Sequence, residues 1–198
     1  ETLIESIVRQ TVQPDEIVVV DGGSSDSTVA ILERLAAGNA NLKVVTTGGA
    51  TPGKGRNVGI AAAGNEWIAL TDGGIKLEDN WLEELINASN GADIVYGNYS
   101  PITDTYFTRW ATFAYVPPRR PEGIRGKFIA SSLLKRSVWE TVGGFPDLRA
   151  AEDLFFMERV ERAGFRSGLA PKALVHWQLR PDFPSTFQQL VLYSKHNV

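Results

Sequence analysis

The sequence predicts an α/β fold with a mostly parallel central sheet flanked by helices. Short apolar runs of strand length alternate with segments whose apolar residues recur at helical spacing. After an opening helix, the first half of the chain runs strand, helix, strand, helix, strand, helix, strand. This order is typical of a parallel sheet with crossover helices, so we expect this half to be Rossmann-like.

The first elements surround a polar loop. Residues 3–8 show helical spacing, so we expect the chain to begin inside a helix, with the strand that usually opens such a domain missing. The β-branched run 16–20 predicts a strand that ends at Asp21, and residues 29–35 predict a helix. Asp26 or Ser27 can cap that helix. Asp21 leaves the strand directly and has no such role, which makes it a candidate site residue.

A glycine-rich loop comes next. Residues 42–45 predict a second strand, and residues 48–53 predict a flexible loop before a small-residue helix that starts near Arg56. The loop matches most of a phosphate-binding loop, but Gly55 stands where Ser or Thr would hold magnesium. Lys54 and Arg56 at a helix start suit an anionic phosphate or nucleotide. The alternative is a solvated loop with two surface cations.

An apolar run at 67–70 predicts a buried strand, and it stops at Asp72 and the pair Gly73-Gly74. Open α/β sheets bind ligands at the carboxyl ends of their strands, so Asp72 is a second candidate. The alternative is an ordinary Asp that caps the next turn. Residues 77–86 then predict a helix, and residues 92–97 predict a further strand.

Aromatic residues crowd into one segment of the second half, at Tyr106, Phe107, Trp110, Phe113 and Tyr115. Prolines and arginines follow at 117–121. Such a segment is typical of a packed Ω-like loop or of a flap that meets a partner. We expect structural packing or a subunit contact rather than direct substrate contact, with a membrane-facing role as a weaker alternative.

The C-terminal part is predicted to hold strands at 128–134 and 173–177 and helices at 137–142, 151–163 and 183–193. Glu152 and Asp153 open the second of these helices, where the helix dipole favours carboxylates in any case. His176 and Trp177 end the last strand, and Arg180 follows it. The chain therefore offers a third group of polar residues close to an element boundary.

Composition narrows the class of protein. A net charge of −3 without a dense Lys/Arg cluster argues against a nucleic-acid binder. The absence of cysteine excludes disulfides and thiolate metal sites and suits a reducing compartment. No apolar segment is long enough to span a bilayer, and the first residues lack the basic start of a signal peptide. We therefore expect a cytoplasmic protein, with association with the inner face of the membrane as an option.

Taken together, these residues give the sequence a resemblance to the large second family of inverting glycosyltransferases with the GT-A fold. Residues 10–28 resemble the nucleotide-binding opening of that family, and residues 53–59 resemble its second nucleotide-contacting segment. Residues 67–82 resemble the strand and helix of its metal motif, and residues 142–153 resemble its acceptor-side motif. These segments occur in the family's order and cover most of residues 1–180.

The resemblance implies transfer of a sugar from a nucleoside-diphosphate sugar to an acceptor hydroxyl, as in polysaccharide or glycolipid biosynthesis. It implies that Asp153 is the general base and that Glu152 orients the acceptor or shapes the site. It places the nucleotide sugar against Asp21, Gly23, Ser24, Lys54, Arg56, Asn57, Thr71, Asp72 and Gly73. Trp177 and Arg180 are expected to contact the diphosphate or the acceptor.

The sequence departs from the family at its metal motif. The family has Asp-x-Asp, whereas Gly74 follows Asp72 at the second position, and Gly22 replaces an Asp in the opening motif. One explanation is a divalent cation, Mn²⁺ or Mg²⁺, held by Asp72, the diphosphate and a later ligand such as His176.

Two further explanations stay open. Lys54, Arg56 or Arg180 would neutralise the diphosphate without a metal, or the protein would be a weak or inactive relative that binds a nucleotide sugar or a glycan. A nucleotidyltransferase is an alternative enzyme class, although the helix that opens with Glu152 and Asp153 has no obvious function there.

We expect a single domain over residues 1–198, with a nucleotide-sugar half at 1–99 and an acceptor-side half at 100–198 that includes an aromatic flap at 104–121. The expected partners are the nucleotide-sugar donor and a glycan, lipid or small-molecule acceptor, without nucleic acid. Oligomerisation through the aromatic segment is a further expectation.

Overall fold

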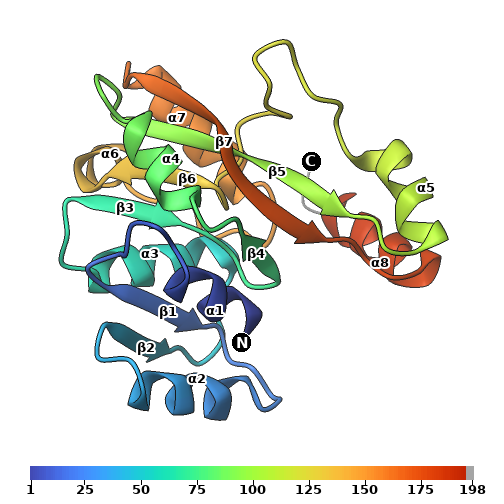
Figure 1. Cartoon of the computed structure of the whole chain (residues 1–198), viewed down its shortest axis with the longest axis horizontal. Helices are drawn as coiled ribbons and strands as arrows, with labels where there is room; N and C mark the ends of the chain where they lie inside the picture. The colour runs from blue at the N-terminus through green and yellow to red at the C-terminus, as the bar shows by residue number, and fades with distance from the viewer. Residues whose placement is uncertain (195–198) are drawn as a thin grey trace. The chain divides into compact units, whose positions relative to one another are not determined.

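The computed structural model describes residues 1–194, and at residues 114, 115 and 192–194 it describes the backbone only. Its elements, in chain order, are α1 (Thr2–Val8), β1 (Ile17–Asp21), α2 (Thr28–Ala37), β2 (Leu42–Thr46), α3 (Pro52–Ala62), β3 (Trp67–Leu70), β4 (Ile75–Leu77), α4 (Trp81–Asn87), β5 (Ile94–Ile102), α5 (Tyr106–Tyr115), β6 (Ser132–Lys135), α6 (Arg136–Val142), α7 (Glu152–Arg162), β7 (Ser167–Gln178) and α8 (Phe183–Ser194) (Figure 1). The predicted α/β class is confirmed.

The chain divides into two compact units that interleave in sequence. Unit 1 holds Glu1, Pro14–Ile68 and Leu134–Phe165, and unit 2 holds Thr2–Gln13, Ala69–Leu133 and the chain from Arg166 onward. β1 and β2 form one sheet, and a second sheet has the strand order β3-β6-β5-β7-β4.

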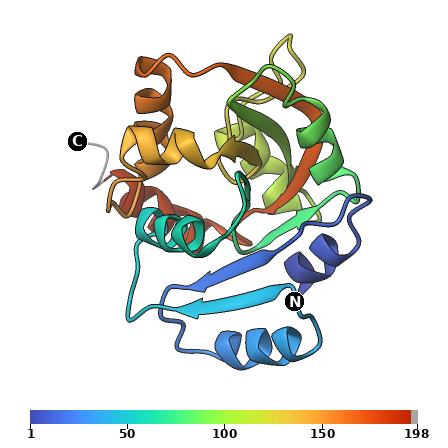
Figure 2. The same ribbon diagram turned by 90° about the vertical axis from the view of Figure 1, so that its left-hand side faces the viewer.

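Unit 1 is built on a parallel strand pair. β1 and β2 run in register from Ile17 opposite Leu42 to Asp21 opposite Thr46, with α3 against β1 and α2 against β2 (Figure 2). The apolar sides of α3, α6 and α7 are buried, as shown by Ile60 and Phe156, which are at most 1% exposed. This packing fixes the carboxyl end of β1 and the start of α3.

Unit 2 is built on two long parallel strands. β5 pairs with β7 from Ile94 opposite Ser167 to Ile102 opposite Gln178, with an irregularity after Tyr96. A side chain at Gly97 would overlap the Ser131 hydroxyl, so only glycine fits this close approach. β4 adds to β7 in the antiparallel sense. The sheet is therefore mixed at this edge, in agreement with the prediction of a mostly parallel sheet.

Three predicted boundaries were wrong. α3 begins at Pro52 and not near Arg56, because Thr51 caps it by accepting a hydrogen bond from the Lys54 N–H and Pro52 fits the first turn. Leu77 ends the strand β4, residues 75–77, rather than opening the helix predicted at 77–86, since Ile75 and Leu77 are buried on one face and α4 begins at Trp81. β6 runs from residue 132 to residue 135, whereas the predicted strand covered residues 128–134.

The aromatic segment was interpreted as an Ω-like loop or a flap, and the helix within it was not predicted: residues 106–115 form α5. Thr105 and Thr108 form a reciprocal capping box at its start. The side chain of Tyr115 lies outside the description. None of the helices within residues 1–194 combines the length and the apolar character that crossing a bilayer would require.

Candidate active site

The candidate residues fall in both units and form one group in each. Unit 1 carries Asp21, Gly23, Ser24, Lys54, Arg56, Asn57, Glu152 and Asp153, and unit 2 carries Thr71, Asp72, Gly73, His176, Trp177 and Arg180.

Asp21 organises the loop that follows β1. It is 5% exposed, and its carboxylate accepts hydrogen bonds from the N–H groups of Gly23 and Ser24, at 3.0 Å each, and from the Ser24 hydroxyl at 2.5 Å. The Ser24 hydroxyl and then its N–H lower the pKa of Asp21, so the carboxylate is held in its charged form. Asp21 therefore does not cap α2, which starts at Thr28, but it does hold the loop before that helix. Its loop is a rigid anionic turn with Gly23 at φ +98°.

Lys54 and Arg56 lie within the first turns of α3, not in the loop before it, and they have different environments. The Lys54 side chain is exposed and has no ion pair with any residue in the described range. Arg56 is only 12% exposed, its Nη1 lies 2.6 Å from the Glu152 Oε1, and its guanidinium lies 5.5 Å from the Phe145 ring centroid. Of these two cations, Lys54 is therefore the one exposed to an anionic ligand.

Asn57 connects α3 to the loop after α6. Its amide nitrogen donates to the Phe145 carbonyl at 2.8 Å, and its Oδ1 accepts from the Phe145 N–H at 2.9 Å and from the Trp139 indole at 2.8 Å. These three bonds use both acceptor positions of the amide oxygen. Asn57 thereby fixes the Gly143-Gly144-Phe145 turn, in which both glycines have a positive φ.

The neighbouring acids at the start of α7 have distinct surroundings. Glu152 is 6% exposed and paired with Arg56. Asp153 is half-buried, and its only hydrogen bond to a described residue is the one that its Oδ1 accepts from the Leu154 N–H at 2.9 Å. Ala151 before them has φ +63°, an uncommon backbone for a residue with a side chain. This turn directs two successive carboxylates differently, one to Arg56 and one toward the start of α7.

In unit 2, β3 ends in an open turn. Thr71 and Asp72 are half-buried and Gly73 and Gly74 are exposed. The Thr71 hydroxyl is buried without a hydrogen-bond partner among residues 1–194. Gly74 has φ +81°, so an Asp in its place would have space but a strained backbone. The local conformation thus suits the glycine that replaces the second acid of the motif.

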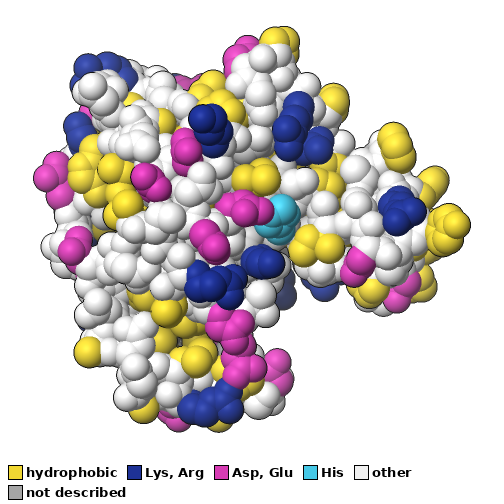
Figure 3. All heavy atoms as spheres, viewed as in Figure 1, with side chains coloured by type: hydrophobic (Ala, Val, Ile, Leu, Met, Phe, Trp, Pro, Cys, Tyr) yellow, Lys and Arg dark blue, Asp and Glu magenta, His cyan; other side chains and the backbone are white. Residues whose placement is uncertain are grey.

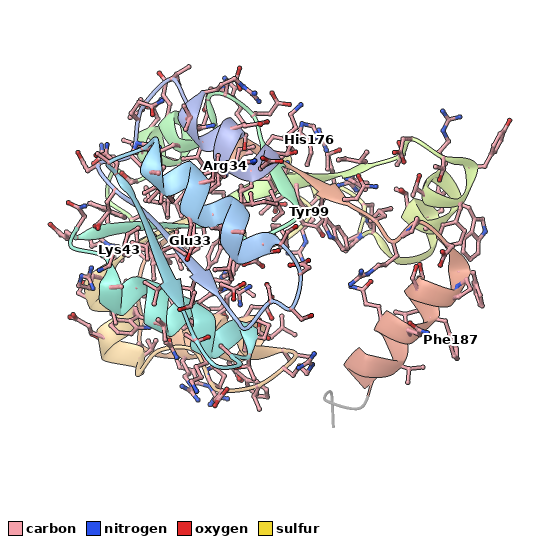
Figure 4. All side chains as sticks on the ribbon, turned by 90° about the horizontal axis from the view of Figure 1, so that it is seen from below. Glu33, Arg34, Lys43, Tyr99, His176 and Phe187 are labelled. Atoms are coloured by element: carbon pink, nitrogen blue, oxygen red, sulfur yellow. The ribbon has the colours of Figure 1, made fainter. Side chains whose placement is uncertain are left out.

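His176 lies on β7 opposite Lys76 of β4 (Figure 4). Its Nε2 is 2.5 Å from the Glu78 Oε1, and both side chains are partly exposed. The sequence interpretation missed Glu78 as its partner, because the short strand β4 that brings it close was not predicted.

Trp177 and Arg180 line a cavity of about 320 Å³ together with Gly73 and Gly74. Residues 178, 179 and 181 and Gln189 of α8 complete its wall. The indole of Trp177 packs edge-on against Tyr99, with ring centroids 6.3 Å apart. Arg180 is exposed and has no ion pair with a described residue. The structure therefore brings the glycine turn after Asp72 together with the two residues predicted for the diphosphate or acceptor.

The donor set does not fit a metal site made by protein ligands alone. No group of three His, Asp or Glu side chains suited to a cation occurs within the described part of the chain. Gly73 and Gly74 supply no carboxylate after Asp72, and the Nε2 of His176 is engaged by Glu78. The predicted pair of Asp72 and His176 therefore lacks a third protein ligand, and we assign no chemical step to a metal.

The structure also shows contacts that the sequence interpretation missed. Thr51 donates from its hydroxyl to the Asp147 carboxylate at 2.5 Å, and Phe145 stacks on Phe156 with centroids 3.9 Å apart. A side chain at Gly53 would overlap the Pro146 carbonyl and press on Glu152. The repeated glycines near residues 53 and 144 were the available signal, since glycine marks close backbone approach.

Comparison with known proteins identifies related sequences. The family described as "Glycosyl transferase family 2" matches residues 1–145. The chain is similar to the "Putative glycosyltransferase EpsH" of Bacillus subtilis, with 30% identity over 90% of the chain and 56% of that protein. It is also similar to the "O-antigen chain rhamnosyltransferase RfbN" of Salmonella typhimurium, with 25% identity over 97% of the chain and 67% of that protein.

Solved structures share the fold. The S. aureus TarS structure in complex with UDP superimposes with a TM-score of 0.71 at 21% identity, covering 91% of this chain and 56% of that one. The TarS complex with UDP-GlcNAc gives 0.69 at 20% identity, covering 91% and 55%. The chain thus spans little more than half the length of EpsH and of these TarS chains.

Proposed function

The chain belongs to glycosyl transferase family 2, and we propose that it transfers a sugar from a nucleoside-diphosphate sugar to an acceptor hydroxyl with inversion at the anomeric carbon. One observation carries the assignment of the base. Of the two adjacent acids on α7, Glu152 is buried against Arg56, whereas Asp153 has a partly exposed carboxylate with one hydrogen bond. Asp153 is therefore the acid that can accept a proton from an incoming acceptor.

In the proposed step the acceptor oxygen forms a bond to the anomeric carbon while the bond from that carbon to the diphosphate oxygen breaks. The hydroxyl proton passes to Asp153, and the electron pair of the broken bond stays on the nucleoside diphosphate. Lys54, the exposed cation of the group in unit 1, is suited to the charge that develops on this leaving group. We propose that Asp21 and its loop hold the nucleoside portion.

The donor carries a nucleoside diphosphate, and UDP is the first probe because TarS was crystallised with UDP and UDP-GlcNAc. Screening UDP- and GDP-sugars for an increase in melting temperature identifies the donor, since a ligand of the folded state raises apparent stability by mass action. Calorimetric UDP titrations with Mn²⁺, with Mg²⁺ and with chelator then report on any metal in the binary complex.

The decisive variant is Asp153→Asn. It should lower turnover of the identified donor by roughly 10²–10⁴-fold, because the amide cannot accept the proton. It should leave nucleotide affinity nearly unchanged, because the asparagine side chain has nearly the same shape as the aspartate side chain. Glu158→Gln, an exposed acid on the same helix paired with Arg162, is the matched control and should retain activity. Full activity of Asp153→Asn would remove Asp153 as the base.

The Gly73-Gly74 turn supports one alternative, a relative that binds a nucleotide sugar without turnover. This alternative predicts UDP binding by the wild-type chain but no transfer or hydrolysis with any donor or any divalent cation. The Asp153→Asn variant would then match the wild type in every assay.

A further inference from the structure

Helices α5 and α8 of unit 2 carry apolar stripes that face solvent. On α5 the stripe is Tyr106, Trp110 and Phe113, which are 91%, 57% and 92% exposed. On α8 it is Phe183, Phe187 and Leu190, which are 60%, 56% and 51% exposed (Figure 4). Both stripes have the spacing i, i+4, i+7, which places the side chains on one face of a helix. Apolar residues at this spacing ordinarily pack on a core.

The strand register brings the two helices to the same end of unit 2. Ile102 of β5 lies opposite Gln178 of β7, and α5 and α8 begin a few residues beyond these positions. Figure 3 shows apolar side chains gathered over the part of the surface where Figure 1 draws α5 and α8. The two stripes hold half of the large apolar side chains that are exposed in the described residues.

Local caps, rather than extensive burial, hold these helices. The capping box of Thr105 and Thr108 starts α5. The Asp182 carboxylate accepts from the Ser185 N–H at 2.8 Å and from its hydroxyl at 2.6 Å at the start of α8. On the described part of α8, Thr186 is the one buried side chain. On the described part of α5, the buried side chains are Thr108 and Ala111. No large apolar side chain described on either helix is therefore buried.

The charge of the neighbouring segment distinguishes the potential partners. Residues 103–127 carry five basic and two acidic side chains, a net charge of +3, whereas the whole chain carries −3. Arg109 lies 6.0 Å from the Tyr106 ring centroid, and Arg119 and Arg120 are exposed. α8 has no charged residue. The aromatic stripe of α5 therefore contains one arginine contact and is followed in the sequence by a segment of net positive charge, a combination that complements an anionic lipid surface.

We propose that these two stripes, with Arg109, Arg119 and Arg120, form a surface that binds the interface of an anionic membrane. Aromatic rings partition into the interfacial region while the arginines contact lipid phosphates. A second copy of the chain fits less well, because a two-fold contact through this surface would bring two positive segments together. Gln189 of α8 lines the cavity with Arg180, so the bound lipid surface would lie against a helix that borders the candidate site.

The test uses large unilamellar vesicles of phosphatidylcholine with or without phosphatidylglycerol and measures co-flotation of the chain. The wild type should bind the anionic vesicles, and binding should fall with added salt. Trp110→Ser combined with Phe113→Ser and Phe187→Ser should weaken binding by about tenfold or more, because apolar burial is lost. Ile86→Ser combined with Leu169→Ser, which alters exposed apolar residues outside the stripes, should bind as the wild type does.

Arg119→Glu combined with Arg120→Glu should also weaken binding to anionic vesicles and reduce its salt dependence. Circular dichroism checks that each variant is folded. Wild-type chain that fails to bind anionic vesicles, or folded stripe variants that bind as tightly as the wild type, would overturn the proposal. A wild-type dimer that the stripe substitutions dissociate, without vesicle binding, would assign the surface to a second copy. None of these measurements needs turnover, so the result is independent of the proposed function.

Discussion

Arg56 and Glu152 form a buried ion pair between α3 and α7, although 96 residues separate them in the sequence. The Arg56 Nη1 lies 2.6 Å from the Glu152 Oε1, and the two side chains are 12% and 8% exposed. Both residues belong to unit 1, and Glu152 directly precedes Asp153 in the sequence. The ion pair gives Arg56 and Glu152 a shared structural role within unit 1.

The first prediction concerns this pair. Arg56→Met should lower the free energy of unfolding by about 3–5 kcal/mol, because it leaves the Glu152 carboxylate buried without the guanidinium. Glu152→Gln should also lower it, because Arg56 loses the charged partner at 2.6 Å. The double variant Arg56→Met/Glu152→Gln should lose less than the sum of the two single variants, since both members of the ion pair are removed together. Urea unfolding of the four proteins measures the coupling. Additive losses would show that the two side chains do not act as a pair.

Glu158→Gln is the control for the ion-pair prediction, because it breaks the exposed ion pair to Arg162 on the same helix. It should change the free energy of unfolding by less than about 1 kcal/mol, as expected for a solvent-exposed pair. A loss as large as that of Glu152→Gln would attribute the effect to α7 in general rather than to burial.

The elements of this fold were predictable where local pattern decides them. The β-branched run before Asp21 and the apolar run before Asp72 predicted β1 and β3, because strand length and a polar stop are local signals. β4 was missed because it is three residues long and depends on pairing with β7. α5 was missed because aromatic crowding was weighed above the i, i+4, i+7 spacing and the threonine cap.

The roles of the candidate site residues stay predictions, but the structure shows which of their contacts the sequence did not indicate. Strand ends and the glycine-rich loop indicated Asp21 and Lys54, and the family resemblance indicated Asp153, yet neither held a signal for which acid Arg56 would pair with. Asn57 was assigned to the nucleotide segment, whereas its amide is engaged by Phe145 and Trp139, which are more than 80 residues away. Such partners follow from the packing of α3 on α6 and α7, which local periodicity does not encode.

The second prediction tests the close approach at the start of α3. Gly53→Ala places a Cβ against the Pro146 carbonyl and the Glu152 side chain, so it should destabilise unit 1 by about 1–3 kcal/mol through overpacking. Gly55→Ala on the same helix has no neighbour within 4 Å of the added Cβ. It should stabilise the helix by about 0.5–1 kcal/mol, because alanine loses less backbone entropy than glycine. Thermal or urea unfolding compares the pair, and equal effects would refute the close approach.

The last prediction concerns acid stability. Ser24 hydrogen bonds lower the pKa of Asp21 in the folded chain, so the unfolded chain binds a proton there at higher pH than the folded chain does. The stabilisation is therefore fully present above the unfolded pKa of about 4 and is lost as pH falls through the lower folded pKa. In Asp21→Asn the urea concentration at the unfolding midpoint should decrease less steeply as the pH falls below about 4, because the variant lacks this titrating carboxyl group.

Asp15→Asn is the control for the Asp21 variant, since Asp15 is exposed and its side chain has no hydrogen bond with a described residue. Asp26 and Asp182 also have a lowered pKa through local hydrogen bonds, so Asp21→Asn should remove only part of the acid sensitivity. Urea midpoints measured from pH 7 to pH 2.5 separate these contributions. An unchanged acid slope in Asp21→Asn would mean that the carboxylate is not held by its loop in solution, and the rigid anionic turn proposed to hold the nucleoside would lose its support.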